Sequence, residues 1–263
     1  LQEMCTGEPY GVPRLGNEQI TAALHPQLLF DAYRELIASS RLEIFYSGSA
    51  ERPRVEDALR AALADLPRTD VEPPPELAPH LPPEEPRAVT ERLDVTQGKL
   101  GMGFSCASAD SAALLMGNTL FGGSSNSKLF LNVREKLSLC YYASSLFHRQ
   151  KGLITVSSGI EFENYQRAYD EIMAQLEAVR KGELEDWELE AARSTLLNAY
   201  ASMGDSQGKL ENFCLGQAAT GRDESPEDLA DQVRAVTPER IFEAMGTAKL
   251  DTVYFLQGKE AEA

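Results

Sequence analysis

The chain of 263 residues contains three histidines, His25, His80 and His148, whose spacing tests whether it could bind a catalytic zinc ion. None of them forms a His-x-x-x-His, His-x-x-Glu-His or Glu-x-x-His pattern, so no helix could present such a ligand pair on one face. The sequence therefore predicts no zinc site made by this chain alone. His25 precedes a proline, His80 lies in a proline-rich stretch and His148 lies in a predicted turn. We expect all three to be exposed to solvent.

Two glycine-rich stretches resemble nucleotide-binding loops only superficially. Gly101-Met102-Gly103 is followed by Cys106 where a dinucleotide fingerprint needs its third glycine, and it lies inside a predicted strand. Residues 122–128, Gly-Gly-Ser-Ser-Asn-Ser-Lys, lack the Gly-Lys-Ser/Thr ending of a phosphate loop. For this second stretch we expect its serines to cap a helix that begins near Lys128, while the glycines let the chain turn.

Nucleophilic catalysis has no support in the sequence. There is no Gly-x-Ser-x-Gly elbow, and no histidine stands near a candidate serine. Cys140 lies beside Tyr141 in a predicted strand without a neighbouring base, which favours a thiol in the core. The cysteines are widely spaced and form no Cys-x-x-Cys pair, so we expect reduced, buried thiols at Cys5, Cys106, Cys140 and Cys214.

Residues 121–145, FGGSSNSKLFLNVREKLSLCYYASS, carry the strongest motif in the chain. They resemble the signature of the second half-domain in the pitrilysin/insulinase-type zinc peptidases, the inverzincins, whose relatives include mitochondrial processing peptidase. That signature combines a Gly-Gly-Ser-Ser loop, a helix with an Arg-Glu pair and a Gly-Leu-x-Tyr sequence at the start of a strand. Ser138 stands where the family usually has glycine. The matching positions are Gly122, Gly123, Ser124, Ser125, Leu129, Phe130, Arg134, Glu135, Lys136, Leu139 and Tyr141.

The resemblance implies that Arg134 and Tyr141 bind substrate, because the family uses such a pair across the cleft from the zinc. A guanidinium offers rigid donors to a peptide carbonyl, and a phenol hydroxyl can donate to a developing oxyanion. Loop residues would add contacts, namely Gly122, Gly123, Ser124 and Ser125. The alternative is that Arg134 pairs with a surface carboxylate and Tyr141 packs in the sheet. Tyr142 takes the role of Tyr141 if the strand register shifts by one.

The family's zinc-binding motif, His-x-x-Glu-His, does not occur in these residues. Either the zinc site lies in a part of the protein ahead of them, or a homologous zinc-bearing subunit supplies it. We therefore expect no metal ligand, cofactor or catalytic residue in this chain and no peptide hydrolysis by it alone. The expected partners are a peptide substrate and either that subunit or a second copy, associating across an exposed sheet edge. The alternative is a catalytically dead scaffold of the same fold.

Composition limits the remaining classes of partner. With 25 Lys and Arg against 41 Asp and Glu the formal charge is −16, which opposes binding to nucleic acids and anionic lipids. The longest uncharged stretch, residues 111–127, falls short of the roughly 20 apolar residues that span a bilayer. No signal peptide is visible. We expect a bacterial, cytoplasmic protein.

Hydrophobic periodicity outlines the elements that must position these residues. In residues 1–66 it predicts helices over 28–37 and 55–66 around one strand, 42–46, which has no partner within this segment. This segment resembles the closing part of the family's first half-domain. Eight of the 14 prolines lie in residues 67–87, which predicts an extended linker.

Residues 88–263 are expected to form the second half-domain. The pattern predicts a hairpin of strands 89–96 and 99–106, followed by strands 139–147, 153–160 and 253–256. Ser225 and Thr237 precede prolines and should cap two of the helices. The predicted fold is α+β, with two-layer half-domains in which a mixed or antiparallel sheet is covered by helices, the first half-domain being incomplete. The helices are expected over 111–120, 128–137, 165–179, 189–203, 206–219, 226–236 and 238–245.

Overall fold

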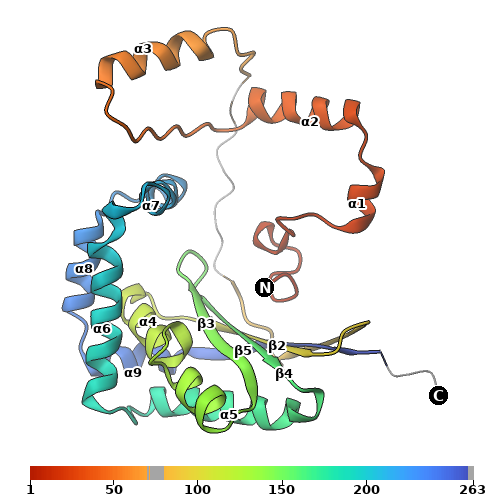
Figure 1. Cartoon of the computed structure of the whole chain (residues 1–263), viewed down its shortest axis with the longest axis vertical. Coiled ribbons are helices and arrows are strands. Elements are labelled where there is room, and N and C mark those ends of the chain that lie inside the picture. Colours follow the sequence, from red (N-terminus) through yellow and green to blue (C-terminus); the bar gives the residue numbers. More distant parts are fainter. Residues whose placement is uncertain (70, 72–79, 260–263) are drawn as a thin grey trace. The chain divides into compact units, whose positions relative to one another are not determined.

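The computed structural model describes residues 1–69, 71 and 80–259. Figure 1 shows the chain, which contains two compact units. Unit 1 comprises Leu1–Val12, Leu77–Met203 and Glu224–Ala263, and unit 2 comprises Pro13–Glu76 and Gly204–Asp223. The first twelve residues therefore belong to the unit that contains the sheet. Part of the predicted linker, residues 70 and 72–79, lies outside the described residues, and its last residue, Arg87, begins a strand.

Unit 1 is built on a five-stranded mixed sheet in the order β1-β5-β2-β4-β3. The pair β1 and β5 is parallel, and the other three pairs are antiparallel. The strands are β1 (Arg87–Leu93), β2 (Gly98–Cys106), β3 (Cys140–His148), β4 (Leu153–Ile160) and β5 (Ala248–Gly258).

The predicted hairpin between 89–96 and 99–106 is wrong, because β5 lies between β1 and β2. Ala88 pairs with Val253, and Val253 pairs in turn with Met102. The burial of the strands explains this order. β5 has a single exposed residue and takes an inner position, whereas β1 is largely exposed and suits an edge.

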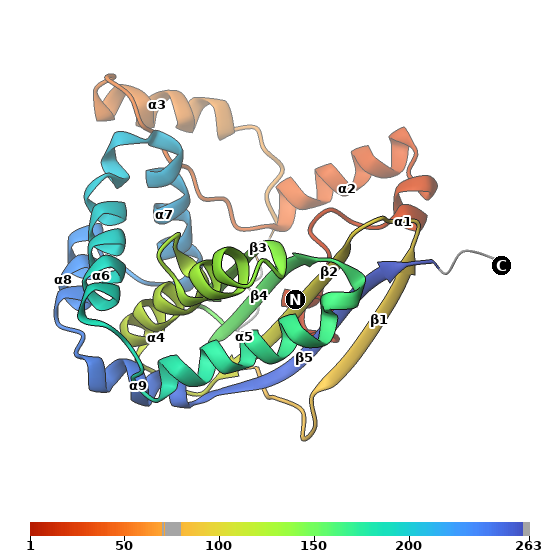
Figure 2. The same ribbon diagram turned by 60° about the horizontal axis from the view of Figure 1, so that its bottom comes forward.

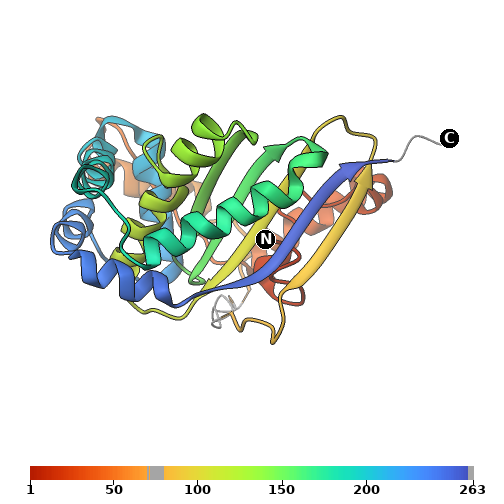
Figure 3. The ribbon, with the colours of Figure 1, turned by 90° about the horizontal axis from the view of Figure 1, so that it is seen from below.

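Helices cover one face of this sheet. Figures 2 and 3 show α4 (Ser111–Asn118) and α5 (Tyr165–Arg180) lying across the strands, and α9 (Pro238–Gly246) packs beside α4. α6 (Asp186–Ala201) and α8 (Pro226–Arg234) pack against each other. The core between helices and sheet includes the alternate β2 residues Leu100, Met102 and Phe104. The predicted α+β class with helices on a mixed sheet is confirmed.

The predicted helix caps are also confirmed. The Ser225 hydroxyl accepts from the Asp228 amide in a capping box, and the Thr237 hydroxyl accepts from the Arg240 amide. Among the described residues, no helix is both long and apolar enough to cross a membrane.

The opposite face of the sheet carries the N-terminal segment. Met4, Cys5 and Leu153 form a small buried cluster with Tyr10 beside it. Gly103 makes room for it, since a Cβ there would lie 2.6 Å from the Met4 sulfur. Sequence periodicity predicted no element here, because residues 1–12 contain only the short helix η1 (Pro9–Gly11).

Unit 2 consists of short helices whose side chains are not buried. It contains α1 (Glu18–Ala23), α2 (Pro26–Ser39), α3 (Arg52–Leu63) and α7 (Gln207–Thr220), and none of the four contains a buried residue. The strand predicted over 42–46 is not formed among the described residues. A strand needs a partner for its backbone groups, and the described residues of this unit provide none.

Candidate functional site

The segment that carries the sequence motif forms π-helical turns and not the predicted α-helix. Residues 119–123 and 129–136 form the π-helical elements η2 (Thr119–Gly123) and η3 (Leu129–Lys136), where the pattern predicted an α-helix over 128–137. The winding changes which residues share a face, so Leu129 and Val133 are buried whereas Leu137 is exposed. π-helical turns are rare in proteins, and those that occur often lie at functional sites.

The loop between η2 and η3 is held by close packing and by serine hydrogen bonds. A Cβ on Gly122 would lie 2.8 Å from the backbone nitrogen of Ser145 on β3, so only glycine fits at this point. The Ser127 hydroxyl accepts from the Phe130 amide at 3.4 Å, which agrees with the expected capping role. Of the predicted loop contacts, Gly122 is buried and Ser124 partly buried, whereas Gly123 and Ser125 are exposed.

Lys128, the last residue of the loop, is fixed by a buried ion pair. Its Nζ lies 3.0 and 3.1 Å from the two carboxylate oxygens of Glu188 on α6. The side chains are only 11% and 8% exposed. Glu188 also accepts from the Glu185 amide at 2.8 Å, so one carboxylate both caps α6 and anchors the loop.

Arg134 projects from η3 and is partly free. Its side chain is 40% exposed, its guanidinium lies 4.6 Å from the centre of the Phe130 ring, and Nε lies 3.6 Å from Glu135. The ring contact holds the guanidinium by a cation–π interaction. The long contact with Glu135 is an exposed ion pair, which contributes little to stability. Several guanidinium N–H groups thus remain available to a ligand.

Tyr141 occupies an irregular position in β3, the edge strand of the sheet. Cys140 pairs with Ile160 and Tyr142 pairs with Gly159, so Tyr141 is the extra residue of a β-bulge. Its side chain is 72% exposed, and its hydroxyl has no hydrogen-bond partner among the described residues. Tyr142 is instead engaged, with its ring against Gly159 and its hydroxyl 3.3 Å from the Ser157 hydroxyl. η3 and β3 pack together, but no hydrogen bond or cation–π contact joins the Arg134 and Tyr141 side chains in the described part of the chain.

Ser138 connects η3 to β3 in a strained conformation. Its φ of 50° makes it the one non-glycine residue with positive φ among those described. We expect Ser138→Gly to raise the free energy of unfolding by about 0.5–1 kcal/mol, because the left-handed conformation costs a residue with a Cβ roughly 1–2 kcal/mol. Part of that gain is offset by the entropy that glycine loses on folding. Urea denaturation measures the change, and Ser138→Ala serves as the control, which should show no gain.

A second group of polar side chains lies on the other face of the sheet and includes His80. The expectation that His80 is exposed is wrong, because its side chain is 3% exposed. Nδ1 lies 2.7 Å from Glu8 Oε1, and Nε2 lies 2.9 Å from Asp251 Oδ2. Lys151 Nζ contacts the other Glu8 oxygen at 2.5 Å. This hydrogen bond from Lys151 is the main reason that the pKa of Glu8 lies below its usual value.

The other histidines differ from each other in exposure. His25 is exposed as predicted and caps α2 by accepting from the Leu28 amide. His148 is half-buried, contrary to the expectation, and its ring nitrogens lie 3.3 Å from the Tyr10 hydroxyl and 2.9 Å from the Thr155 hydroxyl. Burial lowers the pKa of His148 below its usual value, which favours the neutral imidazole.

The cysteines show no sign of activation. All four are free thiols, and only Cys5 is fully buried, so the prediction of burial is wrong for the three that are half-buried. Burial raises the pKa of Cys140 and raises that of Cys106 to about 12. Neither thiol is therefore a nucleophile at neutral pH.

Comparison with known sequences agrees with the motif. Residues 23–196 match the family described as peptidase M16 inactive domain. A Bacillus subtilis protein named "Probable inactive metalloprotease YmfF" is 33% identical over 267 residues, covering 99% of this chain and 62% of that protein. The chain thus spans less than two thirds of that relative's length.

Solved structures share the fold. A conserved protein from Enterococcus faecalis V583 has a TM-score of 0.83 at 27% identity, covering 96% of this chain and 60% of that one. The M16 inactive domain from Pseudomonas fluorescens has a TM-score of 0.77 at 16% identity, covering 100% of this chain and 65% of that one. The family match over residues 23–196 and the 33% identity to the Bacillus subtilis protein show that the chain belongs to the peptidase M16 family as an inactive domain.

Proposed function

We propose that this chain holds a peptide substrate for a zinc-bearing half, which is either another part of the same protein or a homologous subunit. The bulged position of Tyr141 is the observation that carries the proposal. In a regular strand its side chain would alternate with its neighbours, whereas at the bulge Tyr141 is 72% exposed on the edge strand, and bulges often re-aim functional side chains. Its exposed hydroxyl gains no stability from that position, which favours a role in binding.

Arg134 and Tyr141 supply complementary chemistry for a peptide. The Arg134 guanidinium donates to a backbone carbonyl and so orients the extended chain. The Tyr141 hydroxyl donates to the oxygen that becomes negative as the scissile carbonyl is attacked. The zinc ion held by the other half would activate the attacking water. The edge strand β3 is also open to pairing with an extended peptide.

The exposed apolar surface of unit 2 supports an association with the zinc-bearing half or with a second copy of this chain. Apolar side chains of α2 are exposed, as are those of the unpaired residues 42–46. Exposed apolar surface of this kind marks an interaction site. We propose that strands from the zinc-bearing half or from a second copy of this chain pair with residues 42–46. Sedimentation at several concentrations distinguishes the two, because only association of two copies makes the mass of this chain rise with its concentration.

The test is a cleavage assay with the whole gene product, alone and mixed with a homologous zinc-bearing subunit, on a fluorogenic peptide library of mixed sequence. We expect Arg134→Ala and Tyr141→Phe each to lower kcat/KM by about tenfold or more, the size of a lost transition-state contact, while zinc content stays unchanged. Arg167→Ala, an exposed change on α5, is the matched control. Unchanged kcat/KM in both variants would contradict the substrate-binding role.

A catalytically dead scaffold is the second candidate, and the name of the Bacillus subtilis relative, a probable inactive metalloprotease, favours it. In that case the protein would bind a partner through unit 2 without cleaving peptides. Absence of both zinc and cleavage in every mixture, together with a stable complex, would support the scaffold over the peptidase.

A further inference from the structure

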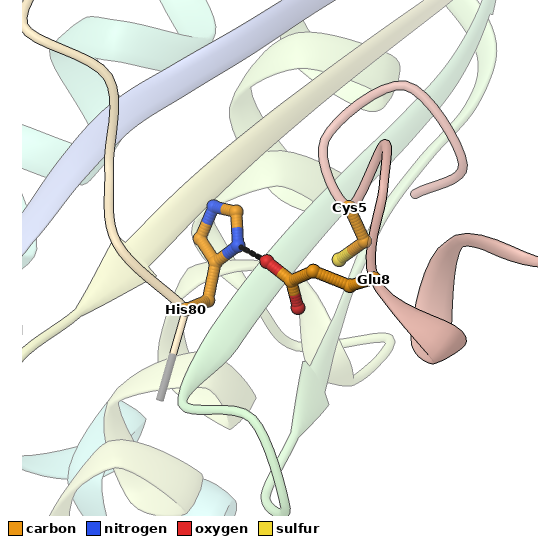
Figure 4. Close-up of side chains that lie close together, drawn as sticks. All are labelled: Cys5, Glu8 and His80. Carbon is orange, nitrogen blue, oxygen red and sulfur yellow. Dashed lines mark hydrogen bonds and ion pairs between the residues drawn. The ribbon is translucent and has the colours of Figure 1, made fainter. Parts of the chain in front are cut away.

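Three side chains that can ligate a metal ion lie close together in unit 1 (Figure 4), those of Cys5, Glu8 and His80. One ligand atom from each lies within 4.8 Å of the other two. We infer that these residues form a binding site for a transition-metal dication of the zinc class. This site is separate from the family's His-x-x-Glu-His motif, and the inference does not depend on the proposed function.

The ligand types identify the class of ion. A thiolate, an imidazole and a carboxylate are ligands of zinc, and sulfur excludes the hard cations Mg²⁺ and Ca²⁺. Cys5 is fully buried and the His80 side chain is nearly so, so both approach the ion from the protein interior. Three protein ligands leave a fourth tetrahedral position for water.

The groups behind the ligands are arranged as in known metal sites. His80 turns Nδ1 toward Glu8 and Nε2 toward Asp251, whose side chain has no exposed surface. A carboxylate on the distal nitrogen fixes the orientation of a ligating imidazole and raises its basicity. Lys151 holds Glu8 Oε2, which leaves Oε1 to bind the ion.

Metal binding leaves the net charge of the group unchanged. A dication, the Cys5 thiolate, Glu8, Asp251 and Lys151 sum to zero. The ion replaces the thiol proton and the proton between Nδ1 and Glu8 Oε1, and both protons leave to solvent. Arg87 lies 4.0 Å from Asp251 and donates to the Glu3 and Met4 carbonyls, at the rim of the same group. Bound metal would thus tie the N-terminal segment to the chain that enters β1.

The experiment is a Co²⁺ titration of the chelator-treated chain, followed by competition with Zn²⁺. We expect one Co²⁺ per chain with the near-ultraviolet charge-transfer absorption of a cobalt–thiolate bond. Cys5→Ser should abolish this absorption, and His80→Gln should weaken binding by 100-fold or more. Cys214→Ser and His25→Gln are matched controls, because each changes the same residue type in unit 2 and should leave binding unchanged.

A thermal melt with and without Zn²⁺ keeps the test decisive if His80→Gln does not fold. Zn²⁺ should raise Tm of the unmodified chain and of Cys214→Ser but not of Cys5→Ser. The inference is overturned if the cobalt–thiolate absorption is absent, or if it survives in Cys5→Ser. The group would then be a hydrogen-bonded network centred on His80.

Discussion

Lys128→Met is expected to lower the free energy of unfolding by about 3–5 kcal/mol, the range for removing one partner of a buried ion pair. Both side chains are nearly inaccessible, and both carboxylate oxygens of Glu188 contact Lys128 Nζ. Methionine fills a similar volume, so the loss comes mainly from leaving the Glu188 carboxylate buried without its counter-charge. Urea denaturation followed by circular dichroism measures the change.

The double variant Lys128→Met/Glu188→Gln separates charge from packing. Glutamine keeps an acceptor for the Glu185 amide, so the cap of α6 survives while the uncompensated charge is removed. We expect the double variant to recover more than half of the stability lost in Lys128→Met. A single-variant loss below about 1 kcal/mol would show that Glu188 reaches water without Lys128 and would contradict the buried-pair account.

The helix α5 of unit 1 was predictable because it buries a stripe of residues at helical spacing. In α5 the buried residues Ala168, Ile172, Leu176 and Val179 recur every three or four positions, and the observed bounds lie within one residue of the prediction. Caps at Ser225 and Thr237 depend only on neighbouring residues, so they were predictable too.

Strand order was not predictable, because it depends on contacts between distant residues. β1 and β2 follow each other along the chain, yet β5 separates them after an interval of some 150 residues. Alternation of apolar and polar residues identifies a strand and its two faces, but it does not show which strand lies beside it in the sheet. Only residues 253–256 of β5 were predicted as strand, and its inner position was not predicted.

The sequence motif indicated which residues are candidates for the site, but not how the structure places their side chains. The motif named Arg134 and Tyr141 as candidates, but the π-helical turns of η3 and the bulge at Tyr141 decide where those side chains lie. His80 was misjudged because its proline-rich surroundings resemble a linker. Its partners Glu8 and Asp251 lie 72 and 171 residues away, a distance at which spacing carries no information.

Gly122→Ala is expected to lower the free energy of unfolding by about 3 kcal/mol, at the upper end of the range for an overpacked site. The added Cβ would lie 2.7 Å from Leu129 Cδ1 and 2.8 Å from the Ser145 nitrogen. Leu129 can change rotamer, but the Ser145 nitrogen belongs to the backbone of β3 and cannot move without shifting the strand. The loss is measured by urea denaturation.

Gly246→Ala is the matched control, because a Cβ at the last residue of α9 meets no atom within 4 Å. We expect its stability to stay within about 0.5 kcal/mol of the unmodified chain, as for surface substitutions generally. An equal loss in both variants would contradict a clash specific to β3, because alanine acting through the unfolded chain would stabilise the protein. A loss specific to Gly122 would show that the first glycine of the loop motif sets the distance between η2 and the edge strand that presents Tyr141.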